Sequence, residues 1–127
     1  MQLIVYLSRA YPEIVSHWEN QDFRLAKAAM YMQTNFSEKI TIERLADIAG
    51  FSIRHFSRLF QKHYGISPIQ YLNELRLRHA MILLEKNDLK ITDIALLCGY
   101  SDSNYFSKAF KQKYGIAPSE WTPSFEK

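Results

Sequence analysis

Two stretches of this sequence place basic and hydrogen-bonding side chains along one face of an expected helix. In the first, four such side chains follow the helical spacing i, i+3, i+4 and i+7: Arg54, Ser57, Arg58 and Gln61. Arginine can form a bidentate pair with guanine, and serine can bond a base edge or a phosphate. This face therefore carries the side-chain types that contact with the major groove of DNA requires.

The second stretch presents an equivalent face, made of Ser103, Asn104, Ser107, Lys108 and Lys111. Asparagine can pair with adenine, and lysine can bond a base edge or a phosphate. A single polar face of this kind is more simply explained as solvated helix surface. Two such faces, both free of acidic residues and both following a glycine turn, favour DNA as the partner.

The distribution of charge supports this interpretation. The net charge of the 127-residue chain is only +3, and residues 1–37 sum to zero, so the whole excess lies in residues 38–127. Within that part, residues 52–65 and 103–115 contain basic residues and no acid. Two acid-free basic segments predict two contacts with a polyanion.

Both stretches belong to an internal repeat that begins near Thr41. At a spacing of 49 residues, Ile42, Leu45, Ala46, Ala49, Gly50, Phe51 and Ser52 match Ile91, Ile94, Ala95, Cys98, Gly99, Tyr100 and Ser101. After one extra residue in the turn, the spacing becomes 50, and Phe60, Tyr64, Gly65, Ile66, Pro68 and Tyr71 match Phe110, Tyr114, Gly115, Ile116, Pro118 and Trp121.

Each copy predicts the same local structure. A short helix (residues 42–49 and 91–98) ends at a glycine that can turn the chain sharply. A serine then starts a second helix (residues 53–64 and 103–114), which buries phenylalanines and exposes the polar face. This order is the helix-turn-helix arrangement, in which the second helix is the recognition helix.

Between the two copies, residues 67–87 predict the longest helix of the chain. Ser67 suits the N-cap, Pro68 suits the first helical position, and Gln70 would complete a capping box. The apolar residues expected to face inward are Leu72, Leu75, Ala80, Leu83 and Leu84. The helix would be about 30 Å long, close to the B-DNA turn of about 34 Å. It could therefore place two recognition helices in successive major grooves.

Upstream of the repeat, residues 23–36 predict a helix that packs through Leu25, Ala28, Ala29 and Met32. Residues 1–21 contain the apolar segment LIVYL at residues 3–7, and Pro12 would interrupt any helix there. One explanation of this segment is a frayed tail. We prefer the end of a preceding domain followed by a linker, because an exposed apolar segment needs a surface that covers it.

The remaining reactive side chains predict neither an enzyme nor a metal or cofactor site. The histidines do not pair at i, i+4 spacing, and the single Cys98 is expected to be a small buried side chain. Nucleophile elbows, phosphate-binding glycine loops and paired catalytic carboxylates are not found. No apolar run reaches the about 18 residues of a membrane span, and no export signal is recognised, so we expect a cytoplasmic protein.

The segments LADIAGFSIRHFSRLFQKHYGISPIQYL and ITDIALLCGYSDSNYFSKAFKQKYGIAPSEW resemble the DNA-binding domain of the AraC/XylS family of bacterial transcription regulators. The resemblance implies an all-α, homeodomain-like domain of seven helices, in which a long central helix joins two helix-turn-helix subdomains. The domain would occupy residues 22–122, with motifs at about 42–65 and 91–115 and the linker helix at 68–87. Residues 1–21 and 123–127 would be tails.

The resemblance also assigns roles to residues at matching positions. Base-edge contacts would fall to Arg54, Ser57 and Arg58 in the first subdomain, and to Ser103, Asn104, Ser107 and Lys108 in the second. Contacts with the DNA backbone would fall to Thr41, Ser52, Lys62, Arg76, Ser101 and Lys111. Arg76 could instead be paired internally with an acid. Ser57 is short where many relatives carry a longer side chain. We therefore expect Arg54 and Arg58 to make most of the base contacts of the first subdomain.

The function implied is sequence-specific binding to double-stranded promoter DNA by the C-terminal part of a transcription activator. RNA polymerase would be a further partner, and a small-molecule effector, commonly a sugar, would bind a preceding N-terminal domain. Two alternatives stay open at this point. One is a protein-interaction module that uses exposed Tyr and Phe, and the other is a nonspecific nucleic-acid binder.

The length of the linker helix yields a prediction. Insertion of residues that preserve helicity within residues 68–87 should weaken binding to a full DNA site more than binding to either half-site, because the insertion changes the spacing of the recognition helices. Titrations with full-site and half-site duplexes measure the two effects. Equal losses on both would show that the helix is only a connector.

Overall fold

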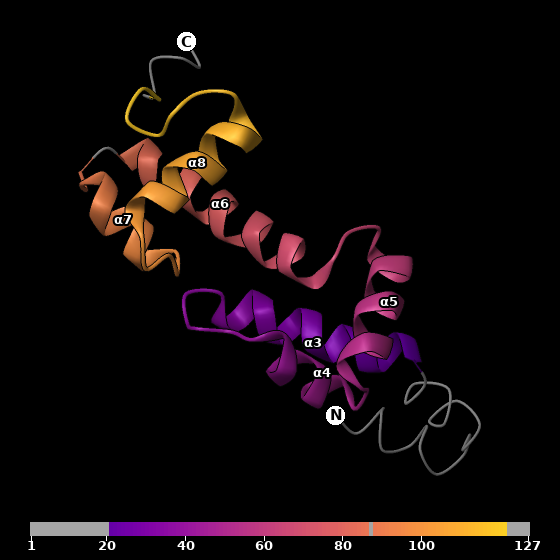
Figure 1. Cartoon of the computed structure of the whole chain (residues 1–127). Helices are drawn as coiled ribbons and strands as arrows, with labels where there is room; N and C mark the ends of the chain where they lie inside the picture. The colour runs from indigo at the N-terminus through magenta and orange to yellow at the C-terminus, as the bar shows by residue number, and fades with distance from the viewer. Residues whose placement is uncertain (1–20, 87, 122–127) are drawn as a thin grey trace, which may run out of the picture. The chain divides into compact units, whose positions relative to one another are not determined.

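The computed structural model describes residues 21–86 and 88–121, and these residues form six helices and no strand (Figure 1). The helices are α3 (Gln21–Asn35), α4 (Ile42–Ala49), α5 (Ile53–Tyr64), α6 (Pro68–Lys86), α7 (Ile91–Leu97) and α8 (Ser103–Tyr114). The all-α class is therefore confirmed for the described part of the chain. Among its helices, none is both long enough and apolar enough to cross a membrane.

The helix bounds lie close to those predicted from the repeat. The bounds of α4, α5 and α8 are the predicted ones, α7 ends one residue early, and α3 covers residues 21–35 where 23–36 were expected.

The count of seven helices is not confirmed, because the described residues hold six. Between α8 and residue 121, where the described part of the chain ends, there is a hydrogen-bonded turn, in which the Glu120 N–H donates to the Ala117 carbonyl at 3.0 Å. The expected tails, apart from Gln21, lie outside the described residues.

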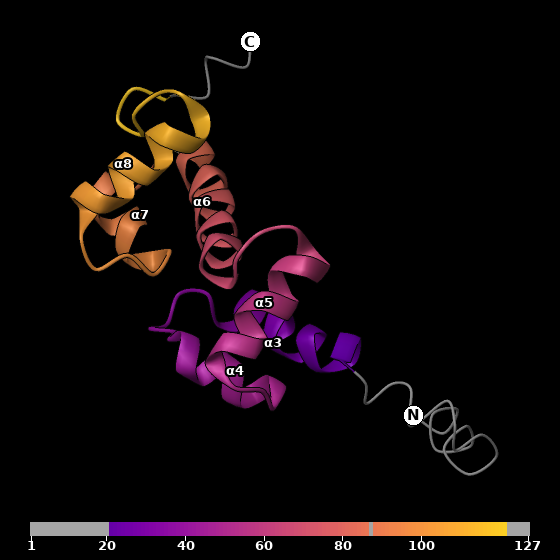
Figure 2. The ribbon, with the colours of Figure 1, turned by 45° about the vertical axis from the view of Figure 1, so that its right-hand side comes forward.

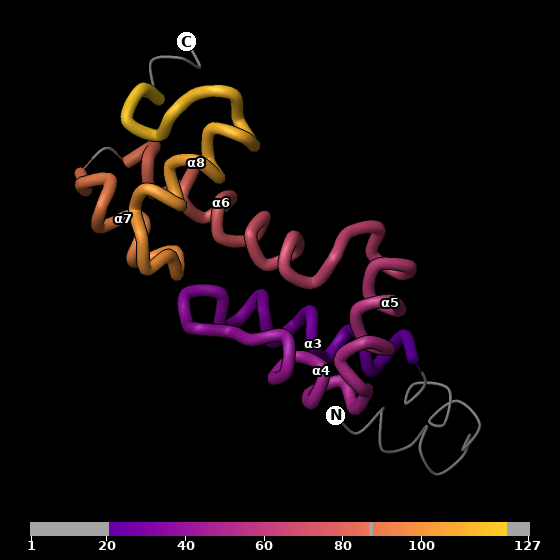
Figure 3. The backbone as a smooth tube through the Cα atoms, viewed as in Figure 1, coloured from indigo at the N-terminus to yellow at the C-terminus, as the bar shows by residue number. Residues whose placement is uncertain are grey.

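The described residues divide into two compact units, each with one copy of the repeat. The first unit comprises residues 21–31 and 41–68, and the second comprises residues 32–40 and 69–121. In both, two helices joined by a tight turn follow a longer helix: α4 and α5 follow α3, and α7 and α8 follow α6 (Figures 2 and 3). Each unit is therefore a three-helix arrangement that ends in a helix-turn-helix.

The core of the first unit fixes which side of α5 faces inward. Phe56 and Phe60 are fully buried, and their ring centroids lie 5.6 Å apart. Burying a side chain of this size stabilises the fold by about 1.5–3 kcal/mol. The remaining buried apolar residues come from α3 and α4: Leu25, Ala28, Ala29, Leu45, Ala46 and Ala49. Since the phenylalanines point inward, the opposite side of α5 points to solvent.

The second unit repeats this pattern with α6, α7 and α8. Its core cluster consists of Leu77, Ala80, Leu84, Ile94, Ala95, Cys98, Tyr100, Phe106 and Phe110. Ala80 and Leu84 are buried as predicted, and so is Leu72. The prediction missed Leu77, whereas Leu75 and Leu83 are only half-buried.

Each helix-turn-helix bends at a glycine with positive φ. Gly50 has φ 79° and forms the C-cap of α4, and Gly99 has φ 97° directly after the C-cap Cys98 of α7. A side chain with a Cβ rarely adopts this conformation. The two predicted glycine turns are confirmed.

The start of the recognition helix differs between the two copies. Ser52 is the N-cap of α5, and its hydroxyl accepts a hydrogen bond from the His55 N–H at 3.2 Å. The N-cap of α8 is Asp102 and not the predicted Ser101; the Asp102 carboxylate accepts from the Asn104 N–H at 2.9 Å. The extra residue in the second turn moves the helix start by one position, and this explains the error.

An arginine of α3 holds the turn of the first unit. Arg24 Nε donates to the Ala49 carbonyl at 2.8 Å, and Nη2 donates to the Gly50 carbonyl. The guanidinium carbon also lies 3.9 Å from the centre of the Phe51 ring, a cation–π geometry. One side chain thus satisfies two carbonyls at the end of α4 and covers the residue that leads into α5.

Arg76 of α6 has the corresponding place in the second unit. Its Nε donates to the Phe36 carbonyl at 2.7 Å, and its Nη2 donates to the Glu38 carbonyl at 2.9 Å. Its guanidinium carbon lies 5.7 Å from the centre of the Tyr100 ring. Tyr100 is the repeat equivalent of Phe51, so both turns carry an arginine over an aromatic ring.

The two arginines show that the repeat extends further upstream than predicted. Arg24, Leu25, Ala28 and Met32 of α3 match Arg76, Leu77, Ala80 and Leu84 of α6 at a spacing of 52. All six apolar members of this set are buried. The chain from Leu84 to Ile91 is three residues shorter than the matching stretch from Met32 to Ile42, which changes the spacing from 52 to 49 and conceals the match.

The close packing around Gly99 predicts a large effect of a single methyl group. A Cβ at this position would meet the Phe36 carbonyl oxygen at 2.6 Å and Arg76 Nε at 2.8 Å, in addition to the strain of a φ of 97°. We expect Gly99→Ala to lower the free energy of unfolding by about 3 kcal/mol or more. Gly115→Ala is the control, because φ is 88° there but nothing lies within 4 Å, so it should cost only about 1–2 kcal/mol. Equal losses in chemical denaturation would contradict this account.

The carbonyl contacts of Arg76 predict that its shape matters as well as its charge. Lysine keeps the charge but lacks the planar fork that reaches two acceptors. We expect Arg76→Lys to lower the free energy of unfolding by about 2 kcal/mol. Arg78→Lys, at an exposed position of the same helix, should change it by less than about 0.5 kcal/mol. Similar values for the two variants would show that the carbonyl contacts contribute nothing.

Candidate nucleic-acid interface

The polar face of α5 is open to solvent, as the burial of its phenylalanines requires. Arg54, Arg58 and Gln61 are exposed, and Ser57 is half-buried at the edge of the face. Within the described residues, neither Arg54 nor Arg58 is engaged in a hydrogen bond or an ion pair. Both guanidinium groups are therefore available to a ligand, and each offers several donors in one plane.

The polar face of α8 is open in the same way. Asn104, Lys108 and Lys111 are exposed, and Ser103 and Ser107 are half-buried. In the part of the chain that the structure describes, the side chains of these residues bind no other residue. Lys113, which lies on α8 outside this face, forms an ion pair, with its Nζ 2.9 Å from Glu74 Oε1. The faces of α5 and α8 thus present matched positions with different chemistry.

The match holds position by position at a spacing of 50 residues, which pairs Arg54 with Asn104, Ser57 with Ser107, Arg58 with Lys108 and Gln61 with Lys111. Guanidinium groups on α5 suit guanine, because they can bond its two major-groove acceptors together. The carboxamide on α8 suits adenine, which offers one donor and one acceptor there. The two faces therefore carry side chains that suit different bases.

The residues predicted to contact the DNA backbone fall into two groups. Lys62 and Lys111 are exposed on the recognition helices, and Thr41 and Ser52 cap the N-termini of α4 and α5. The Thr41 hydroxyl accepts from the Arg44 N–H at 3.1 Å. Helix N-termini of this kind favour a phosphate, because their first N–H groups lack intrahelical partners.

Ser101 and Arg76 form the second group, since the structure gives them other surroundings. Ser101 is exposed but does not cap α8, and the carboxylate of Asp102 stands at that helix start instead. Arg76 binds the two loop carbonyls described above rather than the acid considered from the sequence. Burial lowers the pKa of the Arg76 guanidinium. The charged group of Arg76 is therefore bound by backbone carbonyl groups of its own unit.

Two residues beside the turns were not identified from the sequence. The local sequence pattern assigns no role to Arg24, although its match with Arg76 at a spacing of 52 is a signal that the sequence carries. Ile53, the first residue of α5, is 44% exposed and lies next to Arg54. An apolar residue at the start of an otherwise polar face was the signal for Ile53.

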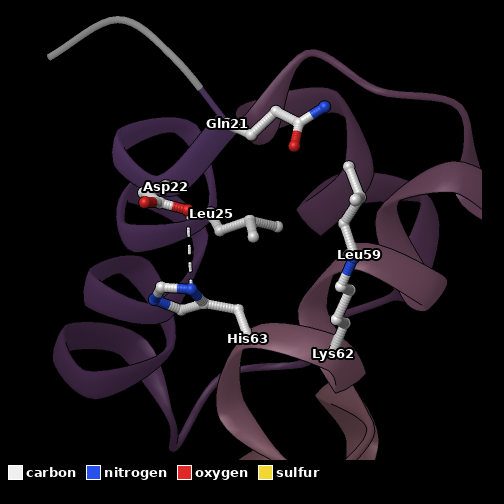
Figure 4. Close-up of a pocket in the computed structure, with 6 residues that line it drawn as sticks. All are labelled: Gln21, Asp22, Leu25, Leu59, Lys62 and His63. Carbon is white, nitrogen blue, oxygen red and sulfur yellow. Dashed lines mark ion pairs between the residues drawn. The ribbon is translucent and has the colours of Figure 1, made fainter. Parts of the chain in front are cut away.

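A small pocket of about 290 Å³ lies where the start of α3 meets α5 (Figure 4). Leu25 and Leu59 line it, and along one side Asp22 Oδ1 and His63 Nδ1 form an ion pair at 3.5 Å. Asp22 lies in the first turn of α3 and His63 in the last turn of α5, positions where the helix dipole favours an acidic and a basic side chain respectively. The pocket is best explained as packing between two helices.

The expectation that Cys98 is a small buried side chain is confirmed. Cys98 is fully buried, and this burial raises the pKa of its thiol to about 11. The thiol is therefore neutral at physiological pH and a poor nucleophile. Among the described residues, no group of three or more His, Cys, Asp or Glu side chains could hold a metal ion.

Comparison with known proteins agrees with this geometry. A family model described as a helix-turn-helix domain matches residues 45–123. The chain is 39% identical over 120 residues to the HTH-type transcriptional activator RhaS of Enterobacter sp. (strain 638), an alignment that covers 94% of this chain and 42% of RhaS. The chain thus spans less than half the length of this curated relative.

Solved structures share the fold. The DNA-binding domain of AdpA, a global transcriptional factor, in complex with a target DNA, has a TM-score of 0.72 and 29% identity, over 75% of this chain and 86% of that one. A probable AraC family transcriptional regulator from Rhodopseudomonas palustris CGA009 has a TM-score of 0.70 and 32% identity, over 76% and 92%. These relatives are transcription regulators rather than enzymes. The chain belongs to the AraC/XylS family of helix-turn-helix transcription regulators, as a domain of the C-terminal DNA-binding type.

Proposed function

We propose that this chain binds double-stranded DNA in a sequence-specific manner, with α5 and α8 each inserting its polar face into the major groove. The observation that carries the proposal is the pair of exposed, acid-free faces on two helices that each follow a glycine turn. A structural neighbour, the domain of AdpA, is in complex with a target DNA. Direct contacts with base edges supply the sequence specificity.

The chemistry of each face assigns roles to its residues. Arg54 and Arg58 bind guanines, and Asn104 binds adenine, while Lys108 contacts a base edge or a neighbouring phosphate. The half-buried hydroxyls of Ser57, Ser103 and Ser107 contact the rim of the groove. Thr41, Ser52, Lys62 and Lys111 bind phosphates and set the register. We leave Arg76 and Ser101 out of this set because of their surroundings in the fold.

The proposal extends to the longer protein in which such a domain acts. The relative RhaS is named as an activator, and the chain corresponds to 42% of its length. We place this domain in a bacterial transcription activator of the cytoplasm, with promoter DNA and RNA polymerase as partners. A small-molecule effector would bind elsewhere in that protein. In this arrangement, each of the two recognition helices reads one major groove of the promoter site.

Charge removal on the matched faces tests the proposal. On a duplex selected from random sequences, Arg58→Ala should weaken binding by about 5- to 150-fold, equivalent to about 1–3 kcal/mol, and relax the preference at one base pair. Lys108→Ala should also weaken binding. Lys86→Ala, which removes an exposed charge outside both recognition helices, is the control and should change binding little. Fluorescence anisotropy at several salt concentrations gives the affinities.

The salt dependence separates the competing functions. The parent chain should lose affinity steeply between about 50 and 200 mM salt, since binding releases counterions from several phosphates. Flat salt dependence, or equal losses for Arg58→Ala and Lys86→Ala, would contradict the proposal. Equal affinity for selected and random duplexes would instead favour nonspecific nucleic-acid binding. Retention of a protein partner without DNA retention would favour an interaction module.

A further inference from the structure

The first residue of the recognition helix in the first unit is an exposed isoleucine. Ile53 is the first residue of α5 and keeps 44% of its surface exposed, whereas Phe56 and Phe60 of the same helix are fully buried. It stands directly between the N-cap Ser52 and the exposed Arg54. Its side chain is therefore not part of the core of the unit.

The second unit has a serine at this position. Ser103 is the first residue of α8 and matches Ile53 at the spacing of 50 residues that relates the two polar faces. Isoleucine and serine have similar intrinsic helix propensities, so the formation of a helix does not explain the difference. The two otherwise matched faces differ at the first residue of the helix, which is apolar in α5 and polar in α8.

The position of Ile53 distinguishes it from the single apolar residues common on protein surfaces. In a helix-turn-helix, the N-terminal residues of the recognition helix are those that approach base edges. The major groove offers one apolar group to such a residue, the 5-methyl group of thymine, which no other base carries. An exposed isoleucine beside a base-reading arginine matches this group in chemistry and in place.

We propose that Ile53 is a specificity-determining residue that packs against the 5-methyl group of one thymine in the half-site read by α5. Ser103 confers no such preference on the half-site read by α8. The inference rests on the proposed DNA-binding function and adds to it one base preference that hydrogen bonding does not supply. The contact removes apolar surface of both partners from water.

Replacement of thymine by deoxyuridine deletes the methyl group and leaves base pairing intact. In duplexes selected from random sequences by the parent chain, each thymine of the α5 half-site is replaced in turn, and the dissociation constant is measured. We expect one replacement to weaken binding of the parent chain about fourfold, the effect of one buried methyl group. Ile53→Ser should bind the thymine duplex about fourfold more weakly and be indifferent to the same replacement.

Two controls accompany the measurement. Ile69→Ser changes an isoleucine of similar exposure, 45%, outside both recognition helices, and this variant should keep the thymine preference of the parent chain. Circular dichroism and thermal unfolding establish that Ile53→Ser folds as the parent does, as expected for an exposed position. Ser103→Ile tests the other helix and should gain a preference for thymine in the α8 half-site.

The outcomes separate this inference from the proposed function. If the parent chain binds its selected duplex but tolerates every thymine replacement, the role of Ile53 is refuted while DNA binding stands. The same holds if the α5 half-site contains no thymine, or if Ile53→Ser is as sensitive to the replacement as the parent chain. If the parent chain shows no preference for selected over random duplexes, the proposed function fails first.

Discussion

The geometry of each unit depends on the close approach of a guanidinium group to a tight glycine turn. At Gly99 the space for a side chain is already filled by Arg76 and by the carbonyl that Arg76 binds, and at Gly50 it is filled by Arg24. Each guanidinium is charged and partly withdrawn from water, which is costly unless hydrogen bonds replace the lost hydration. The carbonyl groups of the loops and helix ends supply those bonds. Because each recognition helix starts within four residues of its glycine, the same contacts fix where that helix begins.

Once the turn is fixed, the helical period determines which side chains of α5 and α8 face the core and which face solvent. Paired phenylalanines separated by four residues point inward on α5 and on α8, and this orientation alone directs the intervening polar residues outward. The units then diverge at their surfaces. The first presents two guanidinium groups behind a serine cap, whereas the second presents an amide and two ammonium groups behind the carboxylate of Asp102. A repeated scaffold thus carries two different chemical surfaces.

The sequence was sufficient for the parts of the structure that follow from local patterns. Apolar spacing and glycine positions predicted α4, α5 and α8 to the residue and the exposed face of each recognition helix. Contacts between distant segments were not predictable in this way. Arg76 could have paired with an acid, bound a phosphate or bridged carbonyls, and only the fold brings residues 36–38 beside it. The upstream half of the repeat was missed because the chain from Leu84 to Ile91 is three residues shorter than the chain from Met32 to Ile42, which breaks a constant spacing.

The placement of charge, rather than the net charge, determines how strongly such a surface attracts DNA. At physiological ionic strength the Debye length is about 8 Å, so a basic residue acts mainly on phosphates that it nearly touches. A net charge of +3 spread evenly would therefore attract DNA weakly. Here Arg24 and Arg76 bind carbonyl groups inside the units, and exposed basic side chains are concentrated on α5 and α8. At α8 the carboxylate of Asp102, which binds the Asn104 N–H, opposes an incoming phosphate. At the start of α5 the cap is the hydroxyl of Ser52, so the N-terminus of α5 lacks the negative charge that Asp102 places at the N-terminus of α8.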